Sequence, residues 1–376
     1  MKRIVTALAA MIAVASNGMA QSTLFETRQA DFTVETVAGG VEHPWSIAFM
    51  PDGNMLVSER AGRLRLIEDG ALRDAPVTGL PDILALQQGG LLGLALHPDF
   101  ETNRLVYFAF SEGRRDRNHT ALARGRLTED ATALEVVETL FHANIDKDRG
   151  LHFGGRIVFL GDGTLLLTLG DGGLYRQDAQ NLGNHLGTII RLNDDGSVPF
   201  DNAFVSLSGA LPEIHSYGHR NVQGIAINPQ TGTVWAHEHG ARGGDEINRI
   251  EAGLNYGWPL ITYGVNYDGT PISDSTHGDG LEQPIWYWDP SIAPSGLIFY
   301  TGEAFENWHG DAFIGGLVSR RLVRLEVEGD RVIATENLLE DFGARIRDVA
   351  SGPDGYLYLL TDAPDGEVLR LTPVIP

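Results

Sequence analysis

A histidine stands in front of two glycines in the stretch GLHFGGR, residues 150–156. A neutral imidazole can act as a general base near pH 7, and Gly154 and Gly155 would let another group approach the backbone closely. His152 could instead only satisfy a backbone group of a loop, so the residue alone leaves both interpretations open. Arg156 is expected to form a structural ion pair.

Arginines occupy two further stretches that lead into apolar segments. Arg220 and Asn221 precede VQGIAI, and Arg345 and Arg347 are two residues apart in GARIRDVASGPDG. Residues two apart point to the same side of an extended chain, and paired guanidinium groups suit bidentate binding of carboxylates. Each arginine could be solvated or ion-paired, but their common placement before strands favours convergence on one anionic ligand.

Carboxylates stand among glycines in the segment 237–259, HEHGARGGDEINRIEAGLNYGWP. Oxygen atoms of such side chains, together with turn carbonyls, are the ligands that Ca²⁺ takes. A solvated acidic turn is the alternative interpretation. No third ligand follows the alternating histidines at a suitable spacing, so zinc is only weakly indicated. The residues concerned are Glu238, Asp245 and Glu246 for calcium and His237 and His239 for zinc.

Glycine-rich stretches at 89–95 and 170–173 match neither the dinucleotide-binding pattern nor the Walker pattern, so a nicotinamide or nucleotide cofactor is not indicated. Aromatic residues cluster further along the chain. Some could pack in the core, and others could stack on a planar cofactor or a sugar. They are Tyr256, Trp258, Tyr263, Tyr267, Trp286, Tyr287 and Trp288.

A repeat of strand, tight turn and strand must position these residues. Its copies recur at intervals of about 60 residues, with Pro, Gly and Asp in the turns and alternating apolar residues beside them. Such a unit cannot bury its apolar faces alone, so the copies predict an all-β six-bladed β-propeller of four-stranded antiparallel blades. An irregular array of β-sandwiches is the alternative. The six copies span 47–59, 94–110, 157–171, 225–240, 306–317 and 349–362.

Segments around the repeats complete the predicted ring. The stretch 32–40 could close it by pairing with the last copy, and hairpins at 62–72 and 320–332 would supply outer strands. Long connections in a compact domain are commonly functional loops. Three such connections are predicted, at 111–150, 172–222 and 255–297.

The N-terminal residues 1–20 have the pattern of a secretory signal peptide: a basic start, an apolar stretch and small residues before a cleavage point. A membrane anchor is the alternative, but no later apolar run approaches the ~20 residues that a span requires. We therefore predict a signal peptide at 1–20, a linker at 21–31 and a single propeller catalytic domain at 32–376. The mature protein would be periplasmic or secreted.

The charge of the chain excludes several partners. Its formal net charge of −22 would repel nucleic acid and anionic membranes, so neither is expected as a partner.

The chain contains no cysteine, which excludes disulfides and thiolate metal sites.

Taken in order, the motifs resemble those of the soluble pyrroloquinoline quinone (PQQ)-dependent aldose sugar dehydrogenases, a family that includes soluble glucose dehydrogenase. The resemblance extends over residues 32–372 and implies a six-bladed propeller that binds PQQ on its top face. The motifs are QGGLLGLALHPDF, HFGGRIVF, TLGDGG, GHRNVQG, EHGARGGDEIN, NYGWP and RIRD.

The resemblance also implies roles for single residues. His152 would be the catalytic base, taking the proton of the anomeric hydroxyl while a hydride moves to PQQ, and Arg220 would stabilise the developing negative charge. The products would be a lactone and reduced PQQ, which a separate electron acceptor reoxidises. The implied cofactor contacts are Gln88, Arg220, Asn221, Tyr267, Arg345 and Arg347.

Calcium is the second cofactor that the resemblance implies. The carbonyls of Gly240 and Ala241 would bind the ion that bridges to PQQ, and Glu246 with the carbonyl of Tyr256 would form a second, structural site. The chain departs from the family at Val318, where a lysine usually contacts the cofactor; Arg320 or Arg321 could reach in instead.

Two other functions stay open at this point. A calcium-dependent lactonase-type propeller hydrolase would use carboxylates on a central metal and would not need the arginine pair. A non-catalytic secreted propeller that binds carbohydrate or protein would leave His152 replaceable. The protein is expected to be a monomer or a homodimer.

Overall fold

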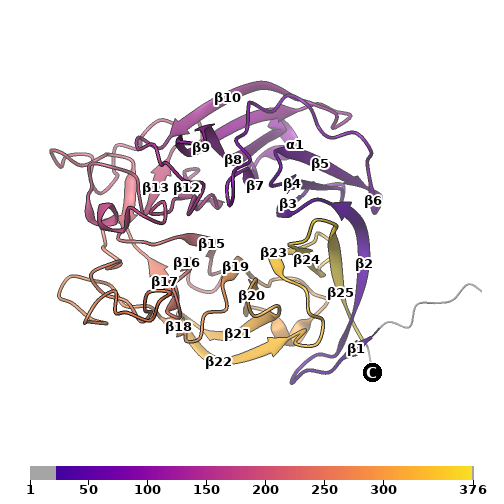
Figure 1. Ribbon diagram of the computed structural model, residues 1–376. Helices are drawn as coiled ribbons and strands as arrows, with labels where there is room; N and C mark the ends of the chain where they lie inside the picture. The colour runs from indigo at the N-terminus through magenta and orange to yellow at the C-terminus, as the bar shows by residue number, and fades with distance from the viewer. Residues whose placement is uncertain (1–22, 375–376) are drawn as a thin grey trace, which may run out of the picture.

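Six antiparallel sheets surround a central axis in the computed structural model of the chain (Figure 1). Five sheets have four strands and one has five, so the predicted all-β six-bladed propeller is confirmed. The structure describes residues 23–374, and the predicted signal peptide, 1–20, lies outside the described residues. Within the described range, no helix has the length and apolar character that crossing a membrane would require.

The first strand of each blade contacts the first strand of the next blade, so these strands line the axis. Blade 1 contains β3 (Pro44–Phe49), β4 (Met55–Glu59), β5 (Arg63–Glu68) and β6 (Ala71–Leu72). Blade 2 contains β7 (Leu91–Leu96), β8 (Leu105–Arg114), β9 (Arg117–Leu127) and β10 (Leu134–His142). Blade 3 contains β11 (Ile157–Phe159), β12 (Leu165–Thr168), β13 (Thr188–Leu192) and β14 (Ile214–Tyr217).

The second half of the ring follows the same order. Blade 4 contains β15 (Val222–Ile227), β16 (Val234–Glu238), β17 (Asp245–Ile250) and β18 (Trp286–Trp288). Blade 5 contains β19 (Pro294–Phe299), β20 (Ala312–Gly316), β21 (Leu322–Glu328) and β22 (Arg331–Leu338). Blade 6 contains β23 (Ile346–Ser351), β24 (Leu357–Thr361), β25 (Gly366–Pro373), β2 (Phe32–Val41) and β1 (Leu24–Phe25). The short helices are α1 (Phe100–Asn103), η1 (Arg176–Gln180) and η2 (Glu306–Trp308).

The ring closes where the N-terminal strand β2 pairs with the C-terminal strand β25, with Val34 opposite Leu371. This confirms the predicted closure, which removes the free edges of an open array. Part of the segment predicted as a linker, 21–31, is also a strand. β1 adds a fifth strand to blade 6, because Phe25 stacks on Phe32 with ring centroids 5.4 Å apart.

Hydrophobic clusters fill the spaces between neighbouring blades, one at each of the six interfaces among the described residues. Alternation along the strands explains how one blade serves two interfaces. On β8, Phe108 and Phe110 pack toward blade 1, whereas Tyr107 and Ala109 pack toward blade 3. Side chains of a strand alternate between its two faces, so both faces of each sheet are buried.

The three connections predicted as long loops contain outer strands of blades 2 to 4, so that prediction is partly wrong. The segment 111–150 is mostly β9 and β10, which have no Pro/Gly-rich turn between them. In blade 5, twelve residues including η2 separate β19 from β20. The fifth copy of the repeat, 306–317, therefore covers only the turn and β20, and its inner strand lies earlier in the chain.

Candidate functional site

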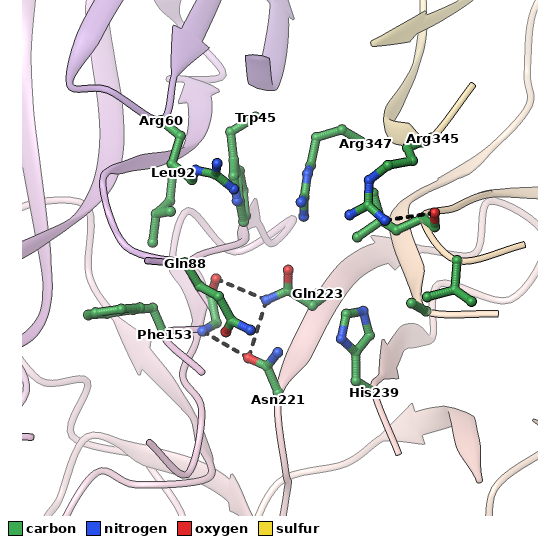
Figure 2. Close-up of a pocket in the computed structure, with 14 residues that line it drawn as sticks. Trp45, Arg60, Gln88, Leu92, Phe153, Asn221, Gln223, His239, Arg345 and Arg347 are labelled. Atoms are coloured by element: carbon green, nitrogen blue, oxygen red, sulfur yellow. Dashed lines mark hydrogen bonds between the residues drawn. The ribbon is translucent and has the colours of Figure 1, made fainter. Parts of the chain in front are cut away.

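A cavity of about 200 Å³ lies at the end of the axis where the inner strands begin (Figure 2). All six blades contribute to its wall, because the ring places equivalent strand starts around one centre. Four residues implied as cofactor contacts line this central cavity, together with two residues that were not predicted. They are Gln88, Asn221, Arg345 and Arg347, joined by Trp45 and Arg60.

Two amide side chains fix the turn that carries His152. The Gln88 Oε1 atom accepts a hydrogen bond of 2.9 Å from the backbone N–H of His152. The Asn221 Oδ1 atom accepts hydrogen bonds from the backbone N–H of Gly154 and from Gln223 Nε2, both at 3.3 Å (Figure 2). Residues from blades 2 and 4 therefore hold one turn of blade 3 in place.

His152 is buried, and its backbone is left-handed, with φ at 45°. Its Nδ1 atom lies 2.6 Å from Asp171 Oδ1. An ionised carboxylate only accepts hydrogen bonds, so Nδ1 carries the hydrogen and Nε2 keeps its lone pair. Burial lowers the pKa of His152; the hydrogen bond to Asp171 opposes this shift, and the charges of Arg220 and Lys147 reinforce it. The imidazole is therefore neutral at pH 7, as a general base must be.

Asp171 is a site residue that the sequence analysis missed, although the motif TLGDGG contains it. Its carboxylate accepts hydrogen bonds from the backbone N–H of Gly173 at 2.7 Å and from Trp258 Nε1 at 2.9 Å, besides the one from His152. Burial opposes its ionisation, but the hydrogen bond from His152 and nearby positive charges outweigh burial and lower the pKa of Asp171. The histidine thus donates its Nδ1 hydrogen to a fixed, ionised carboxylate.

Lys147 lies beneath the same turn and was also missed. Its side chain is buried, its Nζ atom donates to the carbonyl of Leu151 at 3.1 Å, and Nζ lies 3.2 Å from the centroid of the Phe153 ring. Burial holds the pKa of Lys147 well below its usual value. The lysine thus binds the carbonyl of the residue before His152 and packs against the ring of the residue after it, which makes the turn more rigid.

Arg220 lies between the central cavity and the 238–246 segment. Its Nη1 atom donates to the carbonyls of His239 at 3.0 Å and Gly240 at 2.6 Å, and its guanidinium carbon is 5.4 Å from the centroid of the Trp258 ring. Its Nη2 atom reaches the hydroxyl of Tyr267 at 3.5 Å. Tyr267 itself is 73% exposed and is absent from the lining of the central cavity, so the structure places it at the rim.

A second, much smaller cavity of about 10 Å³ contains three of the four residues implied as metal ligands: Gly240, Glu246 and Tyr256. Glu238 also lines it, whereas Ala241 does not. Burial raises the pKa of Glu246 well above its usual value, and repulsion from Glu238 raises it further. Protein donors already engage both oxygens of Glu238, namely His219 Nδ1 and the backbone N–H of Arg220. The Glu246 carboxylate and the backbone carbonyls beside it are oxygen donors that suit a hard cation. These residues fit Ca²⁺.

Asp245, by contrast, is not available as a calcium ligand. Its Oδ1 atom accepts from the backbone N–H of Gly240, and its Oδ2 atom accepts from Ser291 Oγ and from the N–H groups of Ile292 and Ala293, all within 2.9 Å. Protein donors therefore occupy the carboxylate that the sequence suggested for calcium. Asp245 instead fixes the turn at 240–245 against the start of blade 5.

The two histidines considered for zinc are engaged with backbone carbonyls. His237 Nε2 lies 2.9 Å from the Gly296 oxygen, and His239 Nε2 lies 2.8 Å from the Pro294 oxygen. Burial lowers the pKa of His237 to about 3 and that of His239 to about 4, so both are neutral near pH 7. Each Nε2 donates its hydrogen to a carbonyl, which leaves no lone pair there for a metal.

Three guanidinium groups line the central cavity, and two of them share one carboxylate. Arg345 and Arg347 both donate to Asp362 Oδ2, at 3.1 and 2.9 Å. Burial opposes ionisation of Asp362, but the charges and hydrogen bonds around it lower the pKa of this carboxyl. Arg60 forms no side-chain hydrogen bond or ion pair within the described part of the chain. The excess positive charge makes this cavity a site for an anion.

Val318 also lines the central cavity, at the position where the family lysine is expected. Neither arginine proposed to replace it reaches the cavity lining, and Arg321 instead pairs with Glu340 at 3.0 Å. Arg60 follows β4 of blade 1 and enters the same cavity from another direction (Figure 2). Arg60 therefore brings a cationic group to this cavity from a blade that the sequence analysis did not consider.

The buried pair Arg156–Asp348 lies below the cavity and confirms the structural ion pair predicted for Arg156. Its Nη1 atom is 2.6 Å from Asp348 Oδ1, and its guanidinium carbon is 4.2 Å from the centroid of the Trp45 ring. The pair joins blades 3 and 6 across the axis.

The sequence and the fold were compared with those of known proteins. The family model for glucose/sorbosone dehydrogenases matches residues 41–370. The chain is 44% identical to the aldose sugar dehydrogenase YliI of Escherichia coli, over 92% of this chain and 94% of that protein. The crystal structure of the soluble aldose sugar dehydrogenase from Escherichia coli in the apo-form superposes with a TM-score of 0.88 at 43% identity, covering 91% of this chain and 100% of that one. The PQQ-bound aldose sugar dehydrogenase of Streptomyces coelicolor superposes with a TM-score of 0.76 at 29% identity, covering 93% and 100%.

Proposed function

Because the chain belongs to the glucose/sorbosone dehydrogenase family, we propose that it oxidises aldose sugars at the anomeric carbon to lactones, with PQQ and Ca²⁺ as cofactors. Its named relatives are oxidoreductases that act on sugars. The observation that carries the proposal is that His152, oriented by Asp171, lies on the turn whose next residues, 153–154, line the cavity that three guanidinium groups enter.

The central cavity suits PQQ, a planar molecule with three carboxylates. Arg60, Arg345 and Arg347 would hold these carboxylates through charge-assisted hydrogen bonds. Gln88 and Asn221 would line the polar edge, and Tyr267 would contact the cofactor from the rim. Bound there, PQQ supplies the two-electron acceptor for the sugar hydride.

Residues of this chain would accept the proton of the anomeric hydroxyl and stabilise the negative charge that develops. His152 Nε2 takes the proton of the anomeric hydroxyl while the anomeric carbon loses a hydride, which leaves the carbonyl of a lactone. Asp171 keeps the Nδ1–H in place and stabilises the imidazolium that forms. Arg220 adds a fixed positive charge beside the developing negative charge.

Calcium would be held by backbone carbonyls and carboxylates of blade 4. The carbonyls of Gly240 and Ala241 are the proposed ligands beside the cofactor, and Glu246 with the carbonyl of Tyr256 forms the proposed structural site. The enclosed carboxylates at Glu238 and Glu246 support a cation in this region. We further propose that the mature protein acts outside the cytoplasm and passes electrons to a separate acceptor.

Reconstitution tests the proposal. Protein stripped with EDTA is supplied with PQQ and CaCl₂, and the reduction of an electron-accepting dye is followed with several aldoses. We expect dye reduction that requires PQQ, Ca²⁺ and sugar together. Hydrolysis of a lactone without PQQ would favour the lactonase-type hydrolase. Sugar binding with neither reaction, and with no change in the PQQ spectrum, would favour a non-catalytic propeller.

A further inference from the structure

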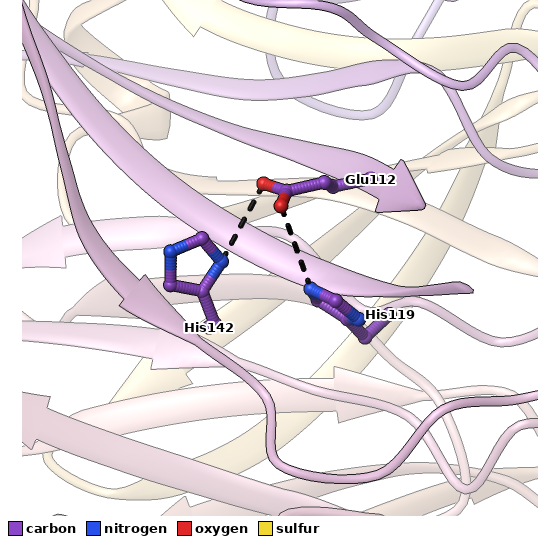
Figure 3. A group of neighbouring side chains, drawn as sticks. All are labelled: Glu112, His119 and His142. Carbon is purple, nitrogen blue, oxygen red and sulfur yellow. Dashed lines mark ion pairs between the residues drawn. The ribbon is translucent and has the colours of Figure 1, made fainter. Parts of the chain in front are cut away.

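Three side chains of types that can bind a metal lie close together on β8, β9 and β10 of blade 2 (Figure 3). None of them lines the central cavity. Glu112 on β8 stands directly opposite His119 on β9 in the strand register. His142 at the end of β10 stands opposite Ala121, two residues from His119. Residues two apart share a face of the sheet, so the register itself places the three side chains together.

The distances in this cluster are those of metal ligands rather than of hydrogen bonds. Glu112 Oε1 lies 3.9 Å from His119 Nε2, and Glu112 Oε2 lies 3.5 Å from His142 Nδ1. Such separations exceed those of N–H···O hydrogen bonds. Two ligands bound tetrahedrally at ~2.0–2.1 Å from one zinc ion stand ~3.3 Å apart, so small side-chain rotations would bring all three to one ion.

A neighbouring carboxylate fixes the tautomer of His119. Its Nδ1 atom lies 3.0 Å from Asp146 Oδ1, and Arg117 donates two hydrogen bonds to Asp146 Oδ2. A carboxylate held by two hydrogen bonds from a guanidinium accepts hydrogen bonds and does not donate them. His119 therefore carries its hydrogen on Nδ1. A carboxylate behind a histidine is the usual outer support of a metal ligand.

The other nitrogen of His119 has no partner. Nε2 is a buried atom without a hydrogen bond among the described residues, and it faces the Glu112 carboxylate. A lone pair that faces an anion is unfavourable unless a cation, either a proton or a metal ion, lies between them. The geometry thus calls for a positive charge at this point.

We propose that Glu112, His119 and His142 form a binding site for a zinc ion. Two imidazoles and one carboxylate suit zinc, whereas Ca²⁺ and Mg²⁺ prefer oxygen ligands alone. Glu112 and His142 also line a groove of about 500 Å³ with residues 81–84. The fourth coordination position opens to this groove, where water or a small anionic ligand would complete the tetrahedron.

Zinc and cobalt titrations of the full chain test the site. The protein is treated with EDTA, freed of chelator and titrated with Zn²⁺ alone in the absence of PQQ and Ca²⁺, with heat release and the thermal midpoint as readouts. Co²⁺ is then used as a spectroscopic probe, because tetrahedral Co²⁺ gives intense visible bands. We expect one tight equivalent of either metal and a zinc-dependent rise in the thermal midpoint.

Variants locate the metal. H119A and H142A should each weaken Zn²⁺ binding by about 100-fold and abolish the tetrahedral Co²⁺ bands, and D146N should weaken it by about 10-fold through the lost support of His119. H277A, at an exposed histidine of blade 4, is the matched control and should bind like the wild type. Far-ultraviolet dichroism shows that each variant is folded. Tight binding and visible bands that persist in folded H119A and H142A, or no tight binding by the wild type, would overturn the proposal.

Discussion

The central cavity and the small cavity beside it carry unbalanced charge of opposite sign. In the central cavity two of the three guanidinium groups share one carboxylate, Asp362. In the small cavity two carboxylates, Glu238 and Glu246, stand with the single guanidinium of Arg220, and the amide of Asn248 reaches both carboxylates at 3.5 Å. Charge that is buried without a partner is costly. One cavity therefore suits a polyanion and the other a cation.

The Arg156–Asp348 pair shows an arginine and a carboxylate in a purely structural role. Both side chains are buried, and each has its counter-charge within the chain. In this pair, which joins two blades, the two charges balance one to one, whereas in the central cavity Arg345 and Arg347 share one carboxylate and Arg60 has no ion pair among the described residues. Substitutions in the two classes should differ in what they damage: stability in the first, ligand binding in the second.

The largest effect on stability is expected for Asp348→Ala. The substitution leaves the guanidinium of Arg156 buried without a counter-charge, which should reduce the free energy of unfolding by about 3–5 kcal/mol. Urea denaturation measures the loss, and Asp365→Ala, at an exposed carboxylate of the same blade, is the control. A loss below about 1 kcal/mol would mean that the internal pairing does not support the fold.

His152→Ala should retain PQQ binding but reduce turnover of the reconstituted protein by about 100-fold or more, since a general base is lost. In the wild type the pKa of His152 lies below its ordinary value of about 6.5, so the imidazole is still in its base form at that pH. The acid limb of kcat/KM should therefore fall only below about pH 6.5. Unchanged turnover, or an acid limb well above that pH, would remove His152 from the proton transfer.

Arg60→Ala should weaken PQQ binding by about 10-fold, because one charge-assisted hydrogen bond is lost, with no loss of stability in the absence of PQQ. Quenching of protein fluorescence by PQQ measures the affinity. Arg331→Ala, at an arginine on the outer strand β22, is the control and should bind PQQ normally. Equal affinities would show that Arg60 does not replace the lysine missing at Val318.

The smallest effect is expected for Glu246→Gln. At ten times its dissociation constant, Ca²⁺ should stabilise the wild type by about 1.4 kcal/mol, and the variant should lose this increment because the cation loses its carboxylate. Thermal melts with and without CaCl₂ measure it, with Glu251→Gln, at an exposed carboxylate of blade 4, as the control. An equal calcium increment in both variants would place the ion elsewhere.

Most of the fold and part of the site could be predicted from local patterns. Period-two alternation and turn residues indicated the inner hairpins, and Gln88, Asn221, Arg345 and Arg347 occur at equivalent strand starts, which a ring necessarily brings together. The hairpin of β9 and β10 was missed because its turn, residues 128–133, contains neither Pro nor Gly. Arg60 was missed because it follows the second strand of its blade.

The sequence by itself determined that the chain forms a propeller of six blades, since each repeat has apolar faces that only its neighbours can cover. Tertiary structure alone decided which charged groups are free to act. Asp245 and Glu246 are adjacent in sequence, yet Asp245 is satisfied by donors from residues 291–293 and Glu246 faces a cavity. The partners of a buried charge come from distant segments, so its availability depends on how the blades meet and not on its own motif.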